Sequence, residues 1–479
     1  MMRYKFKFKP YEHQLDALTK SWNISEFAYF MDMGTGKSKV LIDNMCILYD
    51  RGLVTGSLII APKGVYRNWE RGELPNHLPD HVLVDIVLWN PSQTKKQLEE
   101  QKKLFFPDDN LKIFIMNVEA LSTKKGADIA EKFLIAHDAL MAVDESTTIK
   151  NKDAKRTKTV VSLGKLAKYR RILTGSPVTK SPMDLYSQCE FLDPWLLGHS
   201  SFFSFPHEYA VVQRRTMGAH SFNQVVGYRN LQKLNSLLDK FSFRVKKEDC
   251  LDLPDKVYIK RSVELTKEQR SVYDSLKSFA LAMMAEGNVT TDTILTQLLR
   301  MQQVCSGHVK TDEGIMKTFD SAKLPELMSI LEETDGKVII WATFTHDIIS
   351  IQKAIADKYG DNTVATYYGE TGSDQRQEIV DTFQDPNSTL NYFVGQPRTG
   401  GYGLTLTEAK TVIYYSNNFD LEVRLQSEDR AHRIGQTSKV TYIDIIAENT
   451  TDERVLKALR NKINIASQVL AEDFRDWII

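Results

Sequence analysis

The chain has 479 residues, of which 42% are hydrophobic and 26% are charged, as is typical of globular proteins with full hydrophobic cores. Basic and acidic residues balance at 62 each, so the net charge neither favours nor excludes a polyanionic partner. The 4 cysteines form no Cys-x-x-Cys pair, which argues against a zinc module and for reduced thiols. No apolar run approaches bilayer length, and residues 1–9 alternate like a strand without an apolar signal core.

Short apolar runs rich in β-branched residues recur along the chain, with helical stretches between them. The first set is 57–61, 113–117, 140–144 and 171–174, and the second is 338–342, 364–368, 392–394 and 412–416. Such continuous runs are typical of buried parallel strands joined by crossover helices. From about 180 to 325 the pattern becomes helical, and Pro254 interrupts it. The sequence therefore predicts an α/β protein with two sheets and helical material inserted between their motifs.

A glycine-rich segment, Gly34-Thr35-Gly36-Lys37-Ser38, follows an apolar stretch and precedes a helical one. Its glycines permit a tight turn that directs backbone N–H groups at phosphate beside a helix N-terminus. We expect Lys37 to bridge the β- and γ-phosphates of ATP and Ser38 to bind Mg²⁺. The complete motif requires glycine where Met31 stands, so an ordinary glycine-rich turn remains an alternative.

Asp144 and Glu145 end an apolar strand about a hundred residues later. Asp144 at that position can hold Mg²⁺, and Glu145 can orient or deprotonate the attacking water. The alternative is a solvated strand end. The pair and the glycine-rich segment together predict nucleotide hydrolysis.

Arg430 and Arg433 are three positions apart, which predicts one face of a helix. They can supply positive charge to the developing charge on the γ-phosphate. By themselves, two arginines on a charged helix are more typical of a solvated face. With Lys37 and Glu145 they predict an ATPase whose site is divided between two halves of the chain.

The order of these motifs resembles that of the SNF2 family of superfamily 2 helicase-like ATPases, from about Tyr11 to about Val455. The matching segments are 11–14, 32–38, 61–62 with 68–69, 143–151, 173–177, 299–305, 400–406 and 426–436. The last of these, with Arg-Ala-His-Arg-Ile-Gly-Gln at 430–436, is the most specific. The resemblance implies two RecA-like lobes with helical SNF2-type insertions. Lobe 1 would span 1–252 with a protrusion at about 196–250, and lobe 2 would span 253–479 with a protrusion at about 260–325.

The resemblance also implies roles for single residues. ATP would be bound by Gln14, Gly34, Thr35, Gly36, Lys37, Ser38, Gly403 and Gln426, with Mg²⁺ on Ser38 and Asp144 and catalysis by Lys37, Asp144, Glu145, Arg430 and Arg433. DNA would be contacted by Lys63, Asn68, Trp69, Lys150, Asn151, Lys155, Arg156, Thr174, Gly400 and Gly401, and the coupling motif would be Thr174, Gly175 and Ser176. Five basic residues fall within 149–158, where a solvated loop remains the alternative.

Three departures from the family pattern stand out. Thr147 replaces the histidine of the Asp-Glu-Ala-His motif, Val245 replaces an arginine, and 395–398 replaces a Ser/Thr-rich segment. Coupling through the side chain at position 147 must therefore differ from that in family members with histidine there. Because no chromatin-type module flanks the core, the resemblance favours a compact bacterial or phage-type member in the cytoplasm.

The function that we expect is ATP-dependent translocation along double-stranded DNA by a monomer, with remodelling of forks or junctions by branch migration or regression. One alternative is a strand-separating helicase on DNA or RNA. Another, of a different class, is a nucleotide-gated clamp that binds DNA without moving. A protein-displacing subunit of a larger complex also remains open.

Overall fold

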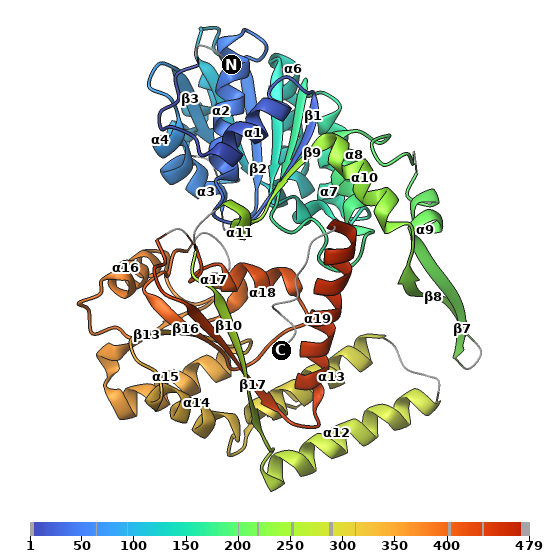
Figure 1. Cartoon of the computed structure of the whole chain (residues 1–479), viewed down its shortest axis with the longest axis vertical. Helices are drawn as coiled ribbons and strands as arrows, with labels where there is room; N and C mark the ends of the chain where they lie inside the picture. Colours follow the sequence, from blue (N-terminus) through green and yellow to red (C-terminus); the bar gives the residue numbers. More distant parts are fainter. Residues whose placement is uncertain are drawn as a thin grey trace. The chain divides into compact units, whose positions relative to one another are not determined.

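The computed structural model describes residues 4–63, 65–92, 94–199, 201–217, 220–250, 253–286, 291–311, 313–400, 404–433 and 435–470. The chain divides into two compact units (Figure 1). Unit 1 comprises Met1–Val212, Val225–Asp252 and Ile465–Asp473, and unit 2 comprises Gln213–Gln224, Leu253–Asn464 and Phe474–Ile479. Each unit is built around its own parallel sheet, as the two sets of apolar runs predict.

Unit 1 contains a 7-stranded sheet in the order β3-β4-β2-β5-β6-β1-β9. All of its neighbouring strands are parallel. The strands are β1 Glu26–Met31, β2 Gly56–Ala61, β3 Val84–Leu88, β4 Leu111–Asn117, β5 Ala139–Asp144, β6 Tyr169–Leu173 and β9 Ser242–Val245. The helices are α1 Glu12–Ser21, α2 Lys37–Asp50, α3 Tyr66–Asn68, α4 Leu74–His77, α5 Lys95–Lys102, α6 Lys124–Ala136, α7 Lys155–Gly164, α8 Asp184–Leu192, α9 Ser204–Tyr209, α10 Leu231–Phe241 and α11 Lys247–Cys250.

Helices cover both faces of this sheet. Leu58 and Ile60 of β2 pack into one hydrophobic cluster with side chains of α6, α7 and α8, whereas Ile59 packs into a second cluster with side chains of α1 and α2. Because successive strand residues point to opposite faces, a strand buried on both faces is apolar at every position. That is why β2, β4 and β5 can be recognised as continuous apolar runs.

Unit 2 contains a 6-stranded parallel sheet in the order β10-β17-β16-β13-β15-β14. The strands are β10 Lys256–Val263, β13 Lys337–Trp341, β14 Val364–Tyr367, β15 Tyr392–Gly395, β16 Ala409–Tyr414 and β17 Val440–Ala447. The helices are α12 Lys267–Glu286, α13 Thr291–Ser306, α14 Lys323–Glu332, α15 Thr345–Tyr359, α16 Ser373–Gln384, α17 Pro397–Gly400, α18 Leu421–Glu428 and α19 Thr451–Leu470. Leu327 of α14 and Ile351 of α15 pack on one face of the sheet, and Phe383 of α16 packs on the other.

The segments between the two sets of motifs are not purely helical, which corrects the predicted helical protrusions. Strands β7 (Ala210–Met217) and β8 (His220–Tyr228) form a 2-stranded sheet, and β11 (His308–Lys310) pairs antiparallel with β12 (Met316–Thr318). Strand β9, within the first predicted protrusion, joins the main sheet beside β1. These strands are short or exposed, and their burial patterns therefore lack the continuous apolar run that identifies a buried strand.

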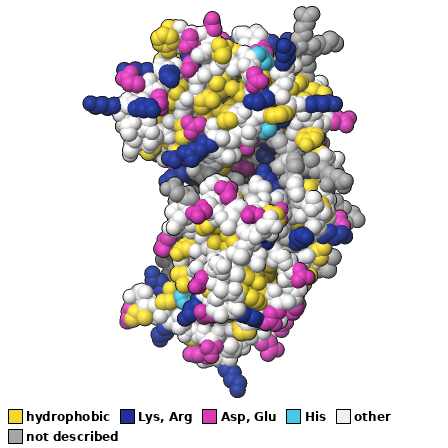
Figure 2. All heavy atoms as spheres, turned by 90° about the vertical axis from the view of Figure 1, so that its left-hand side faces the viewer, with side chains coloured by type: hydrophobic (Ala, Val, Ile, Leu, Met, Phe, Trp, Pro, Cys, Tyr) yellow, Lys and Arg dark blue, Asp and Glu magenta, His cyan; other side chains and the backbone are white. Residues whose placement is uncertain are grey.

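Although residues 1–9 alternate in the manner of a strand, described residues 4–11 form no strand. None of the described helices combines the length and apolar character needed to cross a membrane. Acidic and basic side chains are interspersed over the face shown in Figure 2, as expected from their equal totals of 62.

Candidate nucleotide site

The predicted nucleotide-binding residues of unit 1 follow three strands of the sheet. The glycine-rich turn follows β1, Asp144 ends β5, and Thr174 follows β6, which lies between β1 and β5. Because the strands are parallel, their carboxyl ends meet at one edge, where open α/β sheets bind ligands. The fold therefore brings the glycine-rich turn, the acidic pair and the coupling motif to one edge of unit 1.

Residues 32–36 form a turn between β1 and α2 that resembles a phosphate loop. Gly34 and Gly36 have φ values of 83° and 89°, a left-handed conformation that glycine adopts without steric cost. Lys37 is 8% exposed, and its Nζ donates hydrogen bonds to the carbonyl oxygens of Met31 (2.8 Å) and Asp32 (3.2 Å). Ser38 lies half-buried in the first turn of α2. Methionine at position 31 therefore does not prevent the turn from forming.

Helix α1 supports this turn from outside. Gln14 Nε2 donates to the carbonyl oxygen of Thr35 (3.0 Å), and His13 Nε2 lies 2.8 Å from the same oxygen. A Cβ added to Gly36 would displace the Gln14 amide from the Thr35 carbonyl, and the left-handed φ of Gly36 favours glycine. The structure thus places Gln14 against the phosphate loop, with 3% of its surface exposed. Adenine recognition by Gln14 stays a prediction.

Asp144 is held by a tryptophan that the motifs did not suggest as its partner. Trp69 Nε1 donates to Asp144 Oδ2 (2.9 Å), and the backbone N–H of Glu145 donates to Oδ1 (3.0 Å). Trp69 opens a π-helical turn, Trp69–Glu73, between α3 and α4, and such turns are frequent at functional sites. Burial raises the pKa of Asp144, whereas the Trp69 hydrogen bond and the charge of Lys37 lower it. The carboxylate is therefore desolvated but hydrogen-bonded, which suits a group that binds a cation.

Glu145 has a backbone conformation that is unusual for its residue type. Its φ of 48° and ψ of 61° lie in the left-handed region. For a residue with a Cβ this conformation costs ~1–2 kcal/mol. Such strain concentrates at active sites. Glu145 follows the end of β5, at the same sheet edge as the phosphate loop.

The coupling motif packs directly on the phosphate loop. Thr174 is 1% exposed and its backbone N–H donates to Tyr29 of β1 (3.1 Å). A Cβ on Gly175 would lie 3.3 Å from the backbone nitrogen of Met33. A side chain at Gly175 would therefore press on the loop that is predicted to bind phosphate.

A second link joins the acidic pair to the coupling motif through α8. Ser146 Oγ donates to Gln188 Oε1 (2.7 Å), and Gln188 Nε2 donates to the carbonyl oxygen of Pro177 (2.9 Å). Gln188 is fully buried. Through Gln188, the acidic pair is connected to the coupling motif at Ser146, the neighbour of Thr147, where the family pattern has histidine. No sequence motif pointed to Gln188.

The structure corrects two predicted DNA contacts. Trp69 is 0% exposed and Thr174 is 1% exposed, so neither side chain can touch DNA in this conformation. Trp69 is buried because its indole pairs with Asp144, and Thr174 is buried because it lies inside the sheet edge. Trp69 is therefore a supporting residue of the predicted metal site, and Thr174 keeps only its predicted place in the coupling motif.

The basic segment that follows the acidic pair is only partly free to meet a polyanion. Lys150 Nζ donates to Thr179 Oγ1 (2.8 Å), and Arg156 Nε donates to the carbonyl oxygen of Thr148 (3.0 Å). Lys152 forms an ion pair with Asp153. The predicted contacts that lie on the surface are Lys63, Asn68, Asn151 and Lys155.

In unit 2, the two arginines lie beyond a helix and not on it. Helix α18 ends at Glu428, so the predicted common helix face is wrong. Turns and bends replace helix at 429–433, and Gly435 has a φ of 104°. The two side chains nevertheless converge, because Arg430 Nη1 (3.2 Å) and Arg433 Nη1 (3.3 Å) both donate to the carbonyl oxygen of Leu404.

The two arginines differ in exposure. Arg430 is 1% exposed, and its Nε also donates to the carbonyl oxygen of Gln426 (3.0 Å). Arg433 is half-buried and also donates to Thr405 Oγ1 (2.9 Å). Gln426 is buried on α18 and donates to Glu422 (3.4 Å). The structure therefore makes Arg430 an internal brace of the turn and leaves Arg433 nearer the surface.

A buried ion-pair network anchors α18. Arg424 Nε donates to Glu428 Oε1 (2.7 Å), and its two Nη atoms donate to the carboxylate of Asp444 on β17 (2.6 and 3.0 Å). The Arg424 guanidinium also lies 3.4 Å from the ring centroid of Tyr414. The spacing of residues 424 and 428 could have indicated an i,i+4 pair, but nothing local in the sequence indicates Asp444.

The predicted glycine motif of unit 2 lies largely outside the described residues. Gly401 and Gly403 belong to the part that the structure leaves undescribed, and Gly400 is the last residue of α17. The predicted roles of these three glycines in binding DNA or nucleotide stay predictions.

Comparison with protein families matches two models to successive parts of the chain. A model described as the SNF2-related domain matches residues 28–309, which is more than half of the chain. The chain belongs to the SNF2-related family. A second model, the helicase conserved C-terminal domain, matches residues 322–435 of this SNF2-related chain. The family resemblance carried by the motifs is thereby confirmed, and the structure confirms the α/β fold with two parallel sheets flanked by helices.

Individual relatives of the SNF2-related chain are distant. It is 26% identical over 449 residues to an uncharacterized ATP-dependent helicase of Mycoplasma genitalium, covering 92% of this chain and 40% of that protein. It is 25% identical over 487 residues to a chromatin structure-remodeling complex subunit of Schizosaccharomyces pombe, covering 96% and 39%. The chain thus spans about two fifths of the length of these relatives. A solved SWI2/SNF2 ATPase core of Sulfolobus solfataricus in complex with double-stranded DNA is 25% identical, with a TM-score of 0.43 over 98% of this chain and 95% of that one.

Proposed function

We propose that this SNF2-related chain is a DNA-dependent ATPase that uses ATP hydrolysis to move along double-stranded DNA and to remodel forks or junctions. The observation that carries the proposal is the meeting of Lys37, Asp144 and Glu145 at the carboxyl edge of one parallel sheet, within a chain of this family. Lys37 donates a hydrogen bond to the carbonyl oxygen of Met31, directly before the loop, and the positive charge of Lys37 lowers the pKa of Asp144. These are the groups that phosphoryl transfer to water requires.

Each residue at this edge has a chemical task in the proposal. Lys37 binds the β- and γ-phosphates, and backbone N–H groups of the glycine-rich turn face the same anion. Glu145 accepts a proton from the attacking water or orients it. The carboxylate of Asp144 and the hydroxyl of Ser38 fit the hard oxygen donors that Mg²⁺ prefers, and Mg²⁺ would neutralise charge on the phosphates. Trp69 holds Asp144 in place by occupying one of its oxygens.

Arg433 is proposed as the residue of unit 2 that stabilises charge on the γ-phosphate when the two units close on ATP. Arg430 braces the turn that carries Arg433, because both bind the carbonyl oxygen of Leu404. We take the two units, divided near 252–253, as the two lobes of the motor. A site completed only by closure couples each hydrolysis to one cycle of opening and closing, and that cycle advances the chain along the phosphate backbone.

DNA as the track is proposed from the family and from exposed cations of unit 1. The curated relatives carry names of helicases and chromatin remodelers. Lys63 and Lys155 are exposed. Contacts of this kind bind phosphates by charge and carry little sequence information.

The decisive experiment measures steady-state ATP hydrolysis with single-stranded DNA, duplex DNA, forked DNA and RNA, each at two salt concentrations, with Lys37→Ala as the inactive control. Duplex or forked DNA should raise the rate at least about tenfold above RNA, and added salt should reduce the stimulation because counterions compete for the backbone. Displacement of a triplex-forming strand by the wild type, without separation of a blunt duplex, would establish translocation.

Two alternatives predict different results. A strand-separating helicase would unwind a tailed duplex efficiently and would be stimulated by its single-stranded or RNA substrate. A nucleotide-gated clamp would bind DNA tightly in ATP but would show little stimulated turnover and no triplex displacement. Either pattern would refute the translocation proposal while leaving the ATP site intact.

A further inference from the structure

A cluster of two histidines and one aspartate lies in unit 2, apart from all the predicted nucleotide and DNA residues. His308 begins β11, whereas His346 and Asp347 lie in the first turn of α15. One nitrogen or oxygen atom from each of the three side chains lies within 4.8 Å of the other two. His308 is 1% exposed and Asp347 is 2% exposed, while His346 is half-buried. The cluster therefore combines metal-binding side chains with a largely dry surrounding.

One atom of each buried member lacks a hydrogen bond. His308 Nδ1 and Asp347 Oδ1 are 3.1 Å apart, which is ion-pair distance, but their alignment is not that of a hydrogen bond, and among the described residues neither atom has a hydrogen-bond partner. Leaving such buried polar atoms without hydrogen bonds is costly. Two atoms that bind one Zn²⁺ ion in ideal tetrahedral geometry are ~3.3–3.5 Å apart. The 3.1 Å between these two atoms is slightly shorter, so a shift of a few tenths of an ångström would let them bind one ion.

The surroundings hold the three side chains in place. Ser416 Oγ donates to Asp347 Oδ2 (3.4 Å), and the backbone N–H of Thr343 donates to Ser416 Oγ (2.8 Å). The rings of His308 and His346 stack with centroids 4.5 Å apart, and Phe344 packs edge-on against His308 at 5.3 Å. Outer partners of this kind fix the orientation of metal ligands. The free oxygen, Asp347 Oδ1, is the one that faces His308.

The position of His308 is also fixed by the backbone before it. Gly307 has a φ of 97°, and a Cβ there would lie 2.7 Å from the Cβ of Ser321. The N–H of Phe319 donates to the carbonyl oxygen of Gly307 (2.8 Å). His308 therefore enters the cluster from a turn that tolerates no ordinary side chain at the preceding residue.

We propose that His308, His346 and Asp347 bind one divalent transition-metal ion, for which Zn²⁺ is the best match. Imidazole nitrogens select Zn²⁺ over Mg²⁺ and Ca²⁺, which prefer oxygen ligands throughout. Three protein ligands leave a fourth tetrahedral position for water or another small ligand. The site is distinct from the proposed Mg²⁺ position at Asp144, which belongs to unit 1.

The bound ion would act as a structural crosslink. It would tie the segment that follows the long helices α12 and α13 to the start of α15, beside the ends of β13 and β16. A ligand that binds only the folded state stabilises that state by mass action. The proposal does not depend on ATP hydrolysis, because it concerns binding and stability alone.

The test uses the full chain without a histidine tag, freed of metal by chelator and checked for folding by circular dichroism. Titration with ZnCl₂ should show one bound equivalent by calorimetry and by elemental analysis, and Zn²⁺ should raise Tm. Co²⁺ in place of Zn²⁺ should give visible absorption bands of a nitrogen- and oxygen-bound ion, which a purely structural His–Asp pair would not produce.

The variants His346→Ala and Asp347→Asn test the ligands. Each should lower Zn²⁺ affinity at least about tenfold and remove the Zn²⁺-dependent rise in Tm, and Ser416→Ala should lower affinity to a lesser extent. The exposed His207 lies outside the cluster, and His207→Ala should leave binding unchanged. Absence of stoichiometric Zn²⁺ binding by the folded wild type would overturn the proposal, as would equal binding by His346→Ala, Asp347→Asn and the wild type.

Discussion

At the scale of single residues, Glu145 shows how the site combines chemistry with strain. Its left-handed backbone conformation comes directly after Asp144, where β5 ends. Asparagine or glycine would adopt this conformation more readily than glutamate does. In the proposed mechanism the reaction requires glutamate at this position, and its strained conformation lowers the stability of the fold.

Two substitutions at this position should separate strain from chemistry. The free energy of unfolding of Glu145→Gly should be about 1 kcal/mol higher than that of Glu145→Ala, because only glycine relieves the left-handed strain. In a helix the alanine variant would instead be the more stable of the two. Chemical denaturation of both variants checks the difference, and a more stable Ala variant would contradict the strained conformation. Hydrolysis should fall by at least about 10²-fold in both, while ATP binding persists.

Trp69 lowers the pKa of Asp144 through one hydrogen bond. Burial raises the pKa of Asp144, and the donation from Trp69 opposes that rise. Asp144 must be ionised to bind Mg²⁺. Activity should therefore be present above its pKa and be lost as the pH falls through it.

The variant Trp69→Phe keeps most of the aromatic volume but removes the donor. The pKa of Asp144 should rise further, so the acid limb of the pH–rate profile should move to higher pH. The Mg²⁺ concentration for half-maximal activity should increase about tenfold, as for loss of other partners of metal ligands. Profiles for wild type and variant at several Mg²⁺ concentrations check this, and an unmoved acid limb would argue against the role of Trp69.

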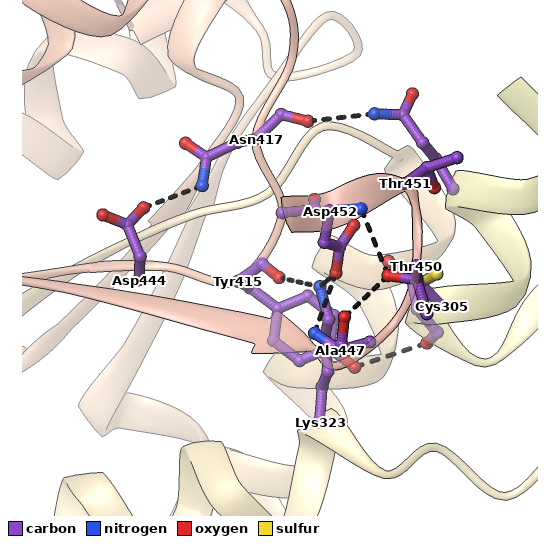
Figure 3. A network of polar contacts seen from close by, with 12 residues as sticks. Cys305, Lys323, Tyr415, Asn417, Asp444, Ala447, Thr450, Thr451 and Asp452 are labelled. Carbon is purple, nitrogen blue, oxygen red and sulfur yellow. Dashed lines mark hydrogen bonds and ion pairs between the residues drawn. The ribbon is translucent and has the colours of Figure 1, made fainter. Parts of the chain in front are cut away.

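At the scale of elements, a buried ion pair joins the starts of α14 and α19 (Figure 3). Lys323 Nζ lies 2.6 Å from Asp452 Oδ2 and donates to the carbonyl oxygen of Tyr415 (3.0 Å). The backbone N–H of Ala447, at the end of β17, donates to the same Asp452 oxygen (3.2 Å). Two helices and two strand ends of unit 2 thus share one polar centre.

Removing one partner of this pair should be costly. Lys323→Met should lower the free energy of unfolding by about 3–5 kcal/mol, because it leaves the carboxylate of Asp452 buried without its cation. The double variant with Asp452→Asn should recover part of the loss by removing that charge. Lys358→Met is the matched control, since its exposed pair with Glu332 should contribute only ~0–1 kcal/mol. Denaturant titrations measure the free energy of unfolding of each variant. Equal losses for Lys323→Met and Lys358→Met would contradict the importance of burial.

The end of α18 is a second case at this scale. The helix was expected to continue through Arg430 and Arg433, but it ends at Glu428. The N–H groups of Ala431 and His432 both donate to the carbonyl oxygen of Glu428 (3.3 Å each). The turn places both arginines on the carbonyl oxygen of Leu404, an acceptor that periodicity alone cannot reveal.

At the scale of the whole molecule, the proposed mechanism requires a residue of unit 2 to act on a nucleotide held by unit 1. Lys37 and Glu145 lie in unit 1, and Arg433 lies in unit 2. The family match extends across both units, since its two models cover residues 28–309 and 322–435. Neither unit alone contains all the groups that the proposed reaction uses.

Arg433→Ala should test this division of labour. DNA-stimulated hydrolysis should fall by about 10³-fold or more, because the charge of the transition state loses its cation, while ATP binding should change only a few-fold. The exposed Arg454 offers a control, and Arg454→Ala should keep the wild-type rate. Single-turnover hydrolysis and nucleotide titration separate the two effects, and an unchanged rate in Arg433→Ala would refute the proposed role.

Features that depend on neighbouring residues could be predicted from the amino-acid sequence. Strands such as β2 and β5 are continuous apolar runs because both of their faces are buried, and Gly34 and Gly36 mark the phosphate loop because only glycine turns there freely. The motif order was sufficient to recognise the family. Exposed strands such as β7 and β8 lack that apolar run, which is why the intervening region was predicted as helical.

Contacts between side chains that are far apart in the sequence depend on tertiary packing and could not be predicted from the sequence. Trp69 was predicted to touch DNA, but folding places it on Asp144, 75 residues away. Likewise, Gln188 bridges two motifs, and His308 meets Asp347. The physical reason is that periodicity and turn chemistry act over a few residues, whereas these contacts arise only when strands and helices pack against one another.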